Sequence, residues 1–307
     1  ITKATKLINI LNPDLLILID FPDFNLHMAA KAKKLGVPVL YYISPQVWAW
    51  RQGRVKKIKK RVDHMAVILP FEEAFYREHG VPATFVGHPL LDERNLLDSK
   101  KTTDIEIEEP VIGLLPGSRD KEVSRHLPIM LAAAERLSLH MSDIRFVVSQ
   151  APTVEASLFD NILKQHETLD RLVVTTEPVG NIFRKSRLVV AVSGTVTLEA
   201  ALSGTPTVII YKVSPFSYWL GRALIQVDHI GLVNLVAQKR IVPELVQKEV
   251  TPENIADHVL NMLNNPEQLQ ETISELIMAQ SKLGKPDASG RVADIAFNLI
   301  NSRTANL

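Results

Sequence analysis

The sequence contains no cysteine in its 307 residues, so disulfide bonds, thiol catalysis and cysteine-ligated zinc are all excluded. Long apolar runs are also missing. The run Leu15 to Ile19, for example, ends at Asp20, far short of the roughly 18 residues that a membrane span requires. A formal net charge of +1 does not point to a polyanionic partner. Composition therefore predicts a soluble or peripheral globular protein, long enough for two domains.

Several common catalytic motifs are absent as well. The sequence has no Gly-x-Gly-x-x-Gly, no Walker P-loop, no Gly-x-Ser-x-Gly and no His-Glu-x-x-His, so dinucleotide redox chemistry, P-loop hydrolysis and zinc proteolysis have no support. Asp-x-Asp, which often holds a metal under a sugar diphosphate, is missing too. The remaining phosphate-handling groups are helix N-termini, hydroxyls and Arg119. This combination suits a metal-independent enzyme with a diphosphate leaving group.

The stretch from Leu188 to Tyr211 reads as strand, turn, helix, turn and strand. Its first turn, Ser193-Gly194-Thr195, places a glycine and two hydroxyls at a helix N-terminus, where free N–H groups and the helix dipole favour a phosphate. Glu199 lies one helical turn further on and can reach a sugar hydroxyl. The alternative is an ordinary capped helix in an α/β domain.

The same alternation occurs twice earlier in the chain. Strand Asp14 to Asp20, a helix from Phe24 to Leu35 and strand Val39 to Ile43 form one βαβ unit, in which Asp23 or Asn25 caps the helix. A later strand, Val111 to Leu115, leads into another glycine-serine turn, which carries Arg119 before a helix over 120–139. Residues 93–110 read as a linker, 216–227 as a helix, and 231–235 as a loop directed back toward the crevice.

A basic helix follows two tryptophans, Trp48 and Trp50, shortly after the first βαβ unit. Seven of the eleven residues from Arg51 to Arg61 are Lys or Arg, with Val55, Ile58 and Val62 at helical spacing. Nucleic acid, an anionic lipid surface and a solvated face all fit this pattern. No nucleic-acid-binding signature accompanies it, so we expect no nucleic-acid partner.

Seven strings in this order resemble the lipid-A-disaccharide synthase family over nearly the whole chain. They are Ile19-Asp20-x-Pro22-Asp23-Phe24-Asn25, Ser44-Pro45-x-Val47-Trp48-Ala49-Trp50-Arg51, Leu69-Pro70-Phe71-Glu72, Val86-Gly87-His88, Leu115-Pro116-Gly117-Ser118-Arg119 with Glu122-Val123, Ser193-Gly194-Thr195 with Leu198-Glu199, and Asn234-Leu235.

The resemblance implies an α/β fold of the GT-B type, in which two Rossmann-like domains face each other across a cleft. It also implies an inverting, metal-independent hexosyltransferase that needs no cofactor. The reaction would move 2,3-diacylglucosamine from its UDP donor to the 6-hydroxyl of 2,3-diacylglucosamine 1-phosphate, giving UDP and the β-1,6-linked disaccharide precursor of lipid A. The enzyme would then be cytoplasmic and peripheral on the inner membrane of a Gram-negative-type bacterium that makes lipopolysaccharide.

Family resemblance and residue chemistry together predict the site. Asp20, at the end of a buried strand, is expected to be the general base that deprotonates the acceptor hydroxyl, with His88 as a second catalytic candidate and Asp23 as a local rival. Substrate contacts are expected from Ser118, Arg119, Ser193, Gly194, Thr195, Glu199, Asn234, Trp50 and Arg51.

Two departures from the family concern the start of the chain and one position near Asn234. Family members begin with a further strand, a Ser-Gly-Asp loop and an apolar membrane-facing segment, none of which is present here, so we expect an incomplete first domain. Val233 stands where some members have proline. The expected domains are 1–98 on the acceptor side and 105–283 on the nucleotide side, with a helix over 284–307 that packs back on the first domain.

Two other functions compete with this one. A related GT-B enzyme such as UDP-N-acetylglucosamine 2-epimerase would need no acylated substrate. A non-catalytic protein that binds anions or membranes through the basic helix would release no UDP. The sequence leaves open whether the protein forms a homodimer.

Overall fold

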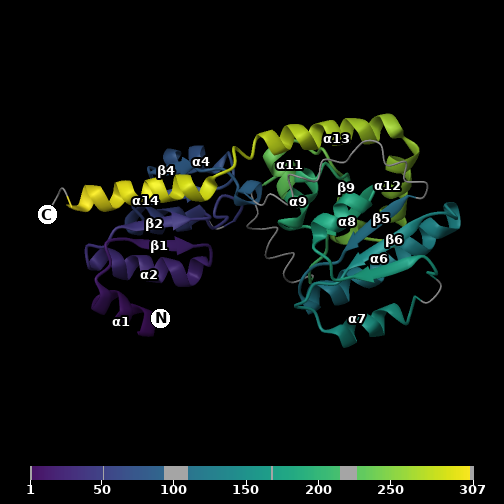
Figure 1. Ribbon diagram of the computed structural model, residues 1–307, viewed down its shortest axis with the longest axis horizontal. Coiled ribbons are helices and arrows are strands. Elements are labelled where there is room, and N and C mark those ends of the chain that lie inside the picture. The colour runs from purple at the N-terminus through teal and green to yellow at the C-terminus, as the bar shows by residue number, and fades with distance from the viewer. Residues whose placement is uncertain (1, 51, 93–109, 167–168, 215–226, 305–307) are drawn as a thin grey trace. The chain divides into compact units, whose positions relative to one another are not determined.

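The computed structural model describes residues 2–50, 52–92, 110–166, 169–214 and 227–304. They divide into two compact units (Figure 1). The first lies mainly within 1–93 and 283–307, and the second mainly within 94–218 and 228–282. In these described ranges no helix combines the length and the apolar character needed to cross a membrane.

The first unit is a parallel sheet of order β1-β2-β3-β4 covered on both faces. Its strands are β1 (Leu16–Ile19), β2 (Val39–Tyr42), β3 (His64–Val67) and β4 (Ala83–Phe85). Its helices are α1 (Thr2–Leu11), α2 (Pro22–Lys34), α3 (Val55–Arg61), α4 (Glu72–Glu78) and α14 (Ala288–Thr304).

Alternating apolar side chains of this sheet pack in opposite directions. Val39 and Tyr41 join the core formed with α2 and α3, whereas Leu40 faces α14 through Val292 and Ala296. The near-continuous apolar strands are therefore explained by burial on both faces, as is usual for parallel sheets. Helix α14 lies on the face opposite to α2 and α3.

The second unit is a six-stranded parallel sheet of order β10-β9-β8-β5-β6-β7. Its strands are β5 (Val111–Leu115), β6 (Arg145–Ser149), β7 (Leu172–Thr175), β8 (Leu188–Val192), β9 (Thr207–Tyr211) and β10 (Glu244–Val246). Its helices are α6 (Asp120–His140), α7 (Ala156–Leu163), α8 (Val179–Lys185), α9 (Val196–Leu202), α11 (Leu232–Ala237), α12 (Pro252–Asn264) and α13 (Pro266–Ser281).

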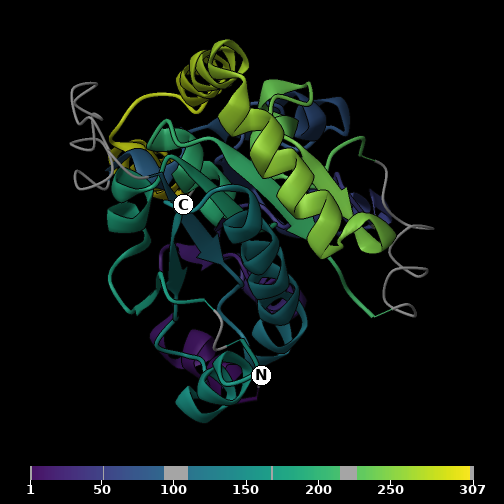
Figure 2. The same ribbon diagram turned by 90° about the vertical axis from the view of Figure 1, so that its right-hand side faces the viewer.

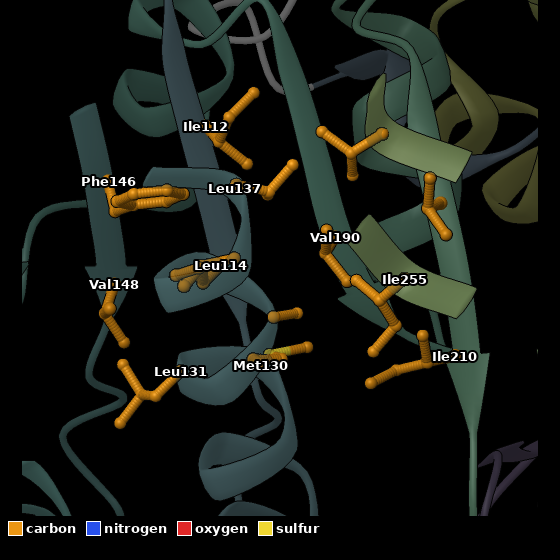
Figure 3. Packing of buried hydrophobic residues seen from close by; sticks show 14 of the residues in the cluster. Ile112, Leu114, Met130, Leu131, Leu137, Phe146, Val148, Val190, Ile210 and Ile255 are labelled. Carbon is orange, nitrogen blue, oxygen red and sulfur yellow. The ribbon is translucent and has the colours of Figure 1, made fainter. Parts of the chain in front are cut away.

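The larger core of this unit lies between the sheet and helices α6 and α12 (Figure 3), which the rotated view shows side by side (Figure 2). Leu114 and Val190 from the sheet meet Met130 of α6 and Ile255 of α12 there. A smaller cluster on the opposite face joins Leu115 to α8 and α9. The α/β class with two parallel sheets, predicted from the sequence, is confirmed.

Two local predictions were wrong. Residues 231–235, expected as a loop, lie almost entirely in helix α11, which begins at Leu232. Asp23 does not cap α2, because it lies inside the first turn and pairs with Arg54 (Nη2 to Oδ1, 2.7 Å). The predicted linker at 93–110 and helix at 216–227 fall almost entirely outside the described residues.

Candidate nucleotide-binding pocket and candidate base

A pocket of about 420 Å³ opens in the second unit where three parallel strands end. Leu115, Ser149 and Val192, the last residues of β5, β6 and β8, are part of its wall. The chain runs outward from β5 to β6 and β7 and then returns to place β8 on the other side of β5. The pocket therefore lies at the topological switch point, where open α/β sheets bind their ligands.

The turn between β5 and α6 forms one side of the pocket. Gly117 has φ 113°, a conformation that L side chains rarely adopt, and a Cβ there would lie 2.6 Å from Oε2 of Glu122. The Glu122 carboxylate folds back over the turn, accepting from the Ser118 backbone N–H (3.1 Å) and pairing with Arg119 Nη1 (2.7 Å). The turn thus presents Arg119, with its side chain 79% exposed, at the N-terminus of a 21-residue helix.

The turn between β8 and α9 forms the other side. Ser193, Gly194 and Thr195 line the pocket together with Glu199 from the first turn of α9. The Ser193 hydroxyl donates to the Ile230 carbonyl (3.0 Å), which fixes this wall to the segment before α11. All the predicted residues of the two turns, Ser118, Arg119, Ser193, Gly194, Thr195 and Glu199, are therefore brought together.

Among the described residues, the charged side chains in the lining are one arginine and two glutamates: Arg119, Glu122 and Glu199. Side-chain charge alone would repel a diphosphate. In the described part of the lining, the groups that attract a diphosphate are Arg119 and the N-termini of α6 and α9, whose unpaired N–H groups and dipoles carry partial positive charge. The carboxylate of Glu199 is then better suited to accept a hydrogen bond from a neutral hydroxyl group than to lie beside a phosphate.

Asn234 does not line this pocket. It is fully buried, and its amide nitrogen donates to the Val242 carbonyl (2.9 Å) and to Glu244 Oε1 (2.7 Å), while its oxygen accepts from two backbone N–H groups. Glu244 in turn accepts from the N–H of Ile230, the residue that holds Ser193. These bonds occupy the amide, so in the structure Asn234 lies behind the Ser193 wall and does not offer its side chain to the pocket, where a direct contact with substrate was predicted.

Asp20 lies in the first unit, directly after β1, with an exposed side chain. Its backbone is left-handed, with φ 46°, and Phe21 follows with φ 41°. Two consecutive non-glycine residues in this region are uncommon, and such strain concentrates at functional sites. Asp20, the predicted base, therefore exposes its side chain to solvent from a strained turn.

His88 is less suited to the role of base. The side chain is 4% exposed, and burial lowers its pKa to about 4, so the ring is neutral at physiological pH. The Leu90 N–H donates to Nδ1 (3.3 Å), which assigns the proton to Nε2. In this tautomer His88 offers a donor rather than a free acceptor for a hydroxyl proton.

Trp48 and Trp50 differ in their surroundings. Trp48 is buried and donates from Nε1 to Glu72 Oε1 (2.9 Å), so it belongs to the core, whereas Trp50 is 43% exposed and remains a candidate contact. Arg51 lies outside the described residues. In the basic helix Val55 and Ile58 are buried and the lysines are exposed: Lys56, Lys57, Lys59 and Lys60.

Several pocket residues were not predicted. Ser149 is the last residue of β6, Ala151 follows two residues later, and Val179 begins α8. Glu122, part of one of the family strings, also lines the pocket, and the sequence predicts no role for it. Ser149 could have been found because it ends a strand beside β5, and neighbouring parallel strands end at one edge of the sheet.

Solved structures with similar folds include sugar-nucleotide enzymes. UDP-GlcNAc 2-epimerase from Neisseria meningitidis bound to UDP-GlcNAc aligns with a TM-score of 0.66 and 12% identity, over 97% of this chain and 80% of that one. The α,α-trehalose 6-phosphate synthase from Burkholderia multivorans aligns with a TM-score of 0.57 and 14% identity, over 99% and 75%. The fold and the pocket define the GT-B class, the architecture of these epimerases and glycosyltransferases.

Sequence comparison identifies the family. The profile described as Lipid-A-disaccharide synthetase matches residues 1–294. The lipid-A-disaccharide synthase of Syntrophus aciditrophicus is 48% identical over 97% of this chain and 79% of its own length, and that of Coxiella burnetii (strain CbuK_Q154) is 42% identical over 94% and 77%. The chain belongs to the lipid-A-disaccharide synthetase family and is a glycosyltransferase of lipid A biosynthesis.

Proposed function

We propose that the chain transfers 2,3-diacylglucosamine from UDP-2,3-diacylglucosamine to the 6-hydroxyl of 2,3-diacylglucosamine 1-phosphate, releasing UDP. The observation that carries this proposal is the pocket at the switch point of the second unit, where two helix N-termini and Arg119 meet in a chain of this family. It has the groups needed to hold a nucleoside diphosphate and to stabilise it as it leaves.

In this proposal the diphosphate of UDP binds the turns at Ser118 and at Ser193-Gly194-Thr195 beside Arg119, and Glu199 accepts from a ribose hydroxyl. Asp20 takes the proton from the acceptor 6-hydroxyl as its oxygen attacks the sugar carbon, and the bond from that carbon to the diphosphate breaks with inversion. Trp50 and Arg51 are proposed to contact the acceptor.

Release of UDP from the acylated donor, measured with and without the acylated acceptor, tests the reaction. Acceptor-dependent release is expected. An epimerase would instead convert UDP-N-acetylglucosamine with no acceptor present, and a protein that only binds membranes would release no UDP under any of these conditions.

Replacing Arg119 with alanine is expected to weaken UDP binding about ten-fold or more, because a charge-assisted hydrogen bond contributes roughly 1.5–3 kcal/mol. Isothermal titration calorimetry measures this. Arg187→Ala is the matched control: Arg187 is an exposed arginine that precedes the opposite end of β8, and it should leave the affinity unchanged. Equal affinities in the two variants would contradict the placement of the diphosphate.

We also propose that the exposed lysines of α3 attract an anionic membrane surface, where each is worth about 1 kcal/mol and is screened by salt. The two arginines described in 52–61 have structural partners, since Arg54 pairs with Asp23 and Arg61 donates to the Leu26 carbonyl. The lysines therefore carry the proposal.

Changing the four lysines Lys56, Lys57, Lys59 and Lys60 to Gln is expected to abolish most co-sedimentation with vesicles rich in anionic lipid at low salt. A matched control changes four exposed lysines on α1 and α2 to Gln, namely Lys3, Lys6, Lys31 and Lys34, with the same change in net charge. If both variants sediment like the parent protein, α3 is only a solvated face.

A further inference from the structure

The strained turn after β1 is held by two buried side chains. Asn25, 8% exposed, donates from Nδ2 to the Ile19 carbonyl (2.9 Å) and to the Asp20 carbonyl (2.6 Å). Tyr41, fully buried on the neighbouring strand β2, donates its hydroxyl to the same Asp20 carbonyl (2.5 Å). The Asp20 backbone N–H completes the set by donating to the Tyr42 carbonyl (3.2 Å).

This arrangement fixes the backbone of Asp20 on both sides. A left-handed residue of this kind costs about 1–3 kcal/mol and persists only when its surroundings over-determine it. Burial raises the pKa of the Tyr41 hydroxyl well above its usual value, so the hydroxyl stays protonated and remains a donor. Three hydrogen bonds from buried donors to two adjacent carbonyls offset the strain.

The side chain of Asn25 does not cap its own helix. Asn25 lies in α2, three residues after its start at Pro22, and Phe21 at the N-cap position makes no side-chain capping bond. The amide of Asn25 reaches back to the end of β1 instead of serving the free N–H groups of its own helix. Its contacts therefore serve the residue that carries the exposed carboxylate.

We propose that Asn25, together with Tyr41, is a positioning residue that holds Asp20 in its left-handed conformation and so aims its carboxylate at the acceptor hydroxyl. The inference rests on the proposed function, in which Asp20 is the general base. Loss of these bonds lets the turn relax toward negative φ, which moves the carboxylate away from its place. A displacement of about 1 Å is enough to cost on the order of 10²-fold in rate.

Asn25→Leu, of similar volume, and Tyr41→Phe, which keeps the ring in the core, test the proposal. We expect Asn25→Leu to lower kcat by about 10- to 100-fold. The KM for acceptor and the Kd for UDP should stay within about two-fold of the parent protein. Tyr41→Phe should show a smaller fall of the same kind. His27→Leu, which changes an exposed residue of the same helix that hydrogen-bonds the Asp23 carbonyl, is the matched control and should keep the parent kcat.

A double-mutant cycle separates positioning from general support of the fold. If Asn25 acts through Asp20, Asn25→Leu should cause no further loss in an Asp20→Asn background. Losses that multiply, or a parent-like kcat in both Asn25→Leu and Tyr41→Phe while Asp20→Asn is slow, overturn the positioning role and leave the proposed function standing. Near-parent turnover in Asp20→Asn itself removes the base assignment and the inference together.

Discussion

Turnover is expected to fall by about 10²- to 10⁴-fold when Asp20 is replaced by asparagine, while UDP binds with unchanged affinity. Asparagine keeps the size of the side chain and tolerates the left-handed backbone of this position, where φ is 46°. The substitution therefore removes the proton acceptor with little change in the turn. The decisive measurements are the rate of UDP release with acylated donor and acceptor, and calorimetric binding of UDP.

Two neighbouring candidates supply the controls. Asp23→Asn removes a carboxylate that already pairs with Arg54, so only a modest effect is expected. His88→Gln replaces a neutral ring whose Nδ1 already accepts from a backbone N–H, and it should retain far more activity than Asp20→Asn. If Asp20→Asn turns over at a near-normal rate while one of these two is inactive, the role of base belongs to that residue.

Sequence periodicity was sufficient to predict β5 and β8 and the pocket turns that follow them. Apolar runs such as Val111–Leu115 and Leu188–Val192 each end at a glycine-containing turn, and the parallel order of the sheet brings those turns to one edge. Arg119 and Thr195 could therefore be assigned to one site although 75 residues separate them in the sequence, from 119 to 195.

Residues whose role depends on a distant partner could not be predicted in the same way. Asn234 looks like an accessible polar residue in the sequence, but Glu244 and the backbone of Val242 saturate its amide in the fold. Aspartate often caps helices, and Asp23 stands near the start of α2, yet Arg54 from another helix pairs with it. Pattern and propensity describe only neighbours along the chain, and these contacts form between segments that tertiary packing brings together.

Glu72 carries the largest expected effect on stability. It is 1% exposed and lies at the start of α4, where Oε1 accepts from Trp48 Nε1 (2.9 Å) and Oε2 accepts from the backbone N–H groups of Ile68 (3.2 Å) and Leu69 (3.0 Å). These bonds favour the carboxylate, but burial outweighs them and raises the pKa of Glu72 from 4.5 to about 7. Below about pH 7 the protonated form is therefore favoured inside the folded first unit.

The sign of the pH dependence follows from this raised pKa. Between about pH 4.5 and 7 the folded state binds a proton that the unfolded state has released, so stability due to Glu72 is full below this window and is lost as pH rises through it. Each pKa unit of difference between the two states corresponds to about 1.4 kcal/mol, which gives a loss of about 3 kcal/mol across the window. Glu72→Gln does not titrate and should not show this loss.

The measurement is urea unfolding of the first unit at pH 5 and pH 8, followed by the fluorescence of Trp48. Of the three tryptophans in the chain, Trp50 and Trp219 are replaced by Phe in every variant so that Trp48 alone reports. The free energy of unfolding of the parent protein, relative to Glu72→Gln, should fall by about 3 kcal/mol from pH 5 to pH 8. Glu78→Gln, an exposed change on the same helix, should keep the parent pH dependence. Parallel pH curves for the parent protein and Glu72→Gln would show instead that the three donors hold Glu72 ionised across this range, so that its hydrogen bonds outweigh the cost of burying its charge.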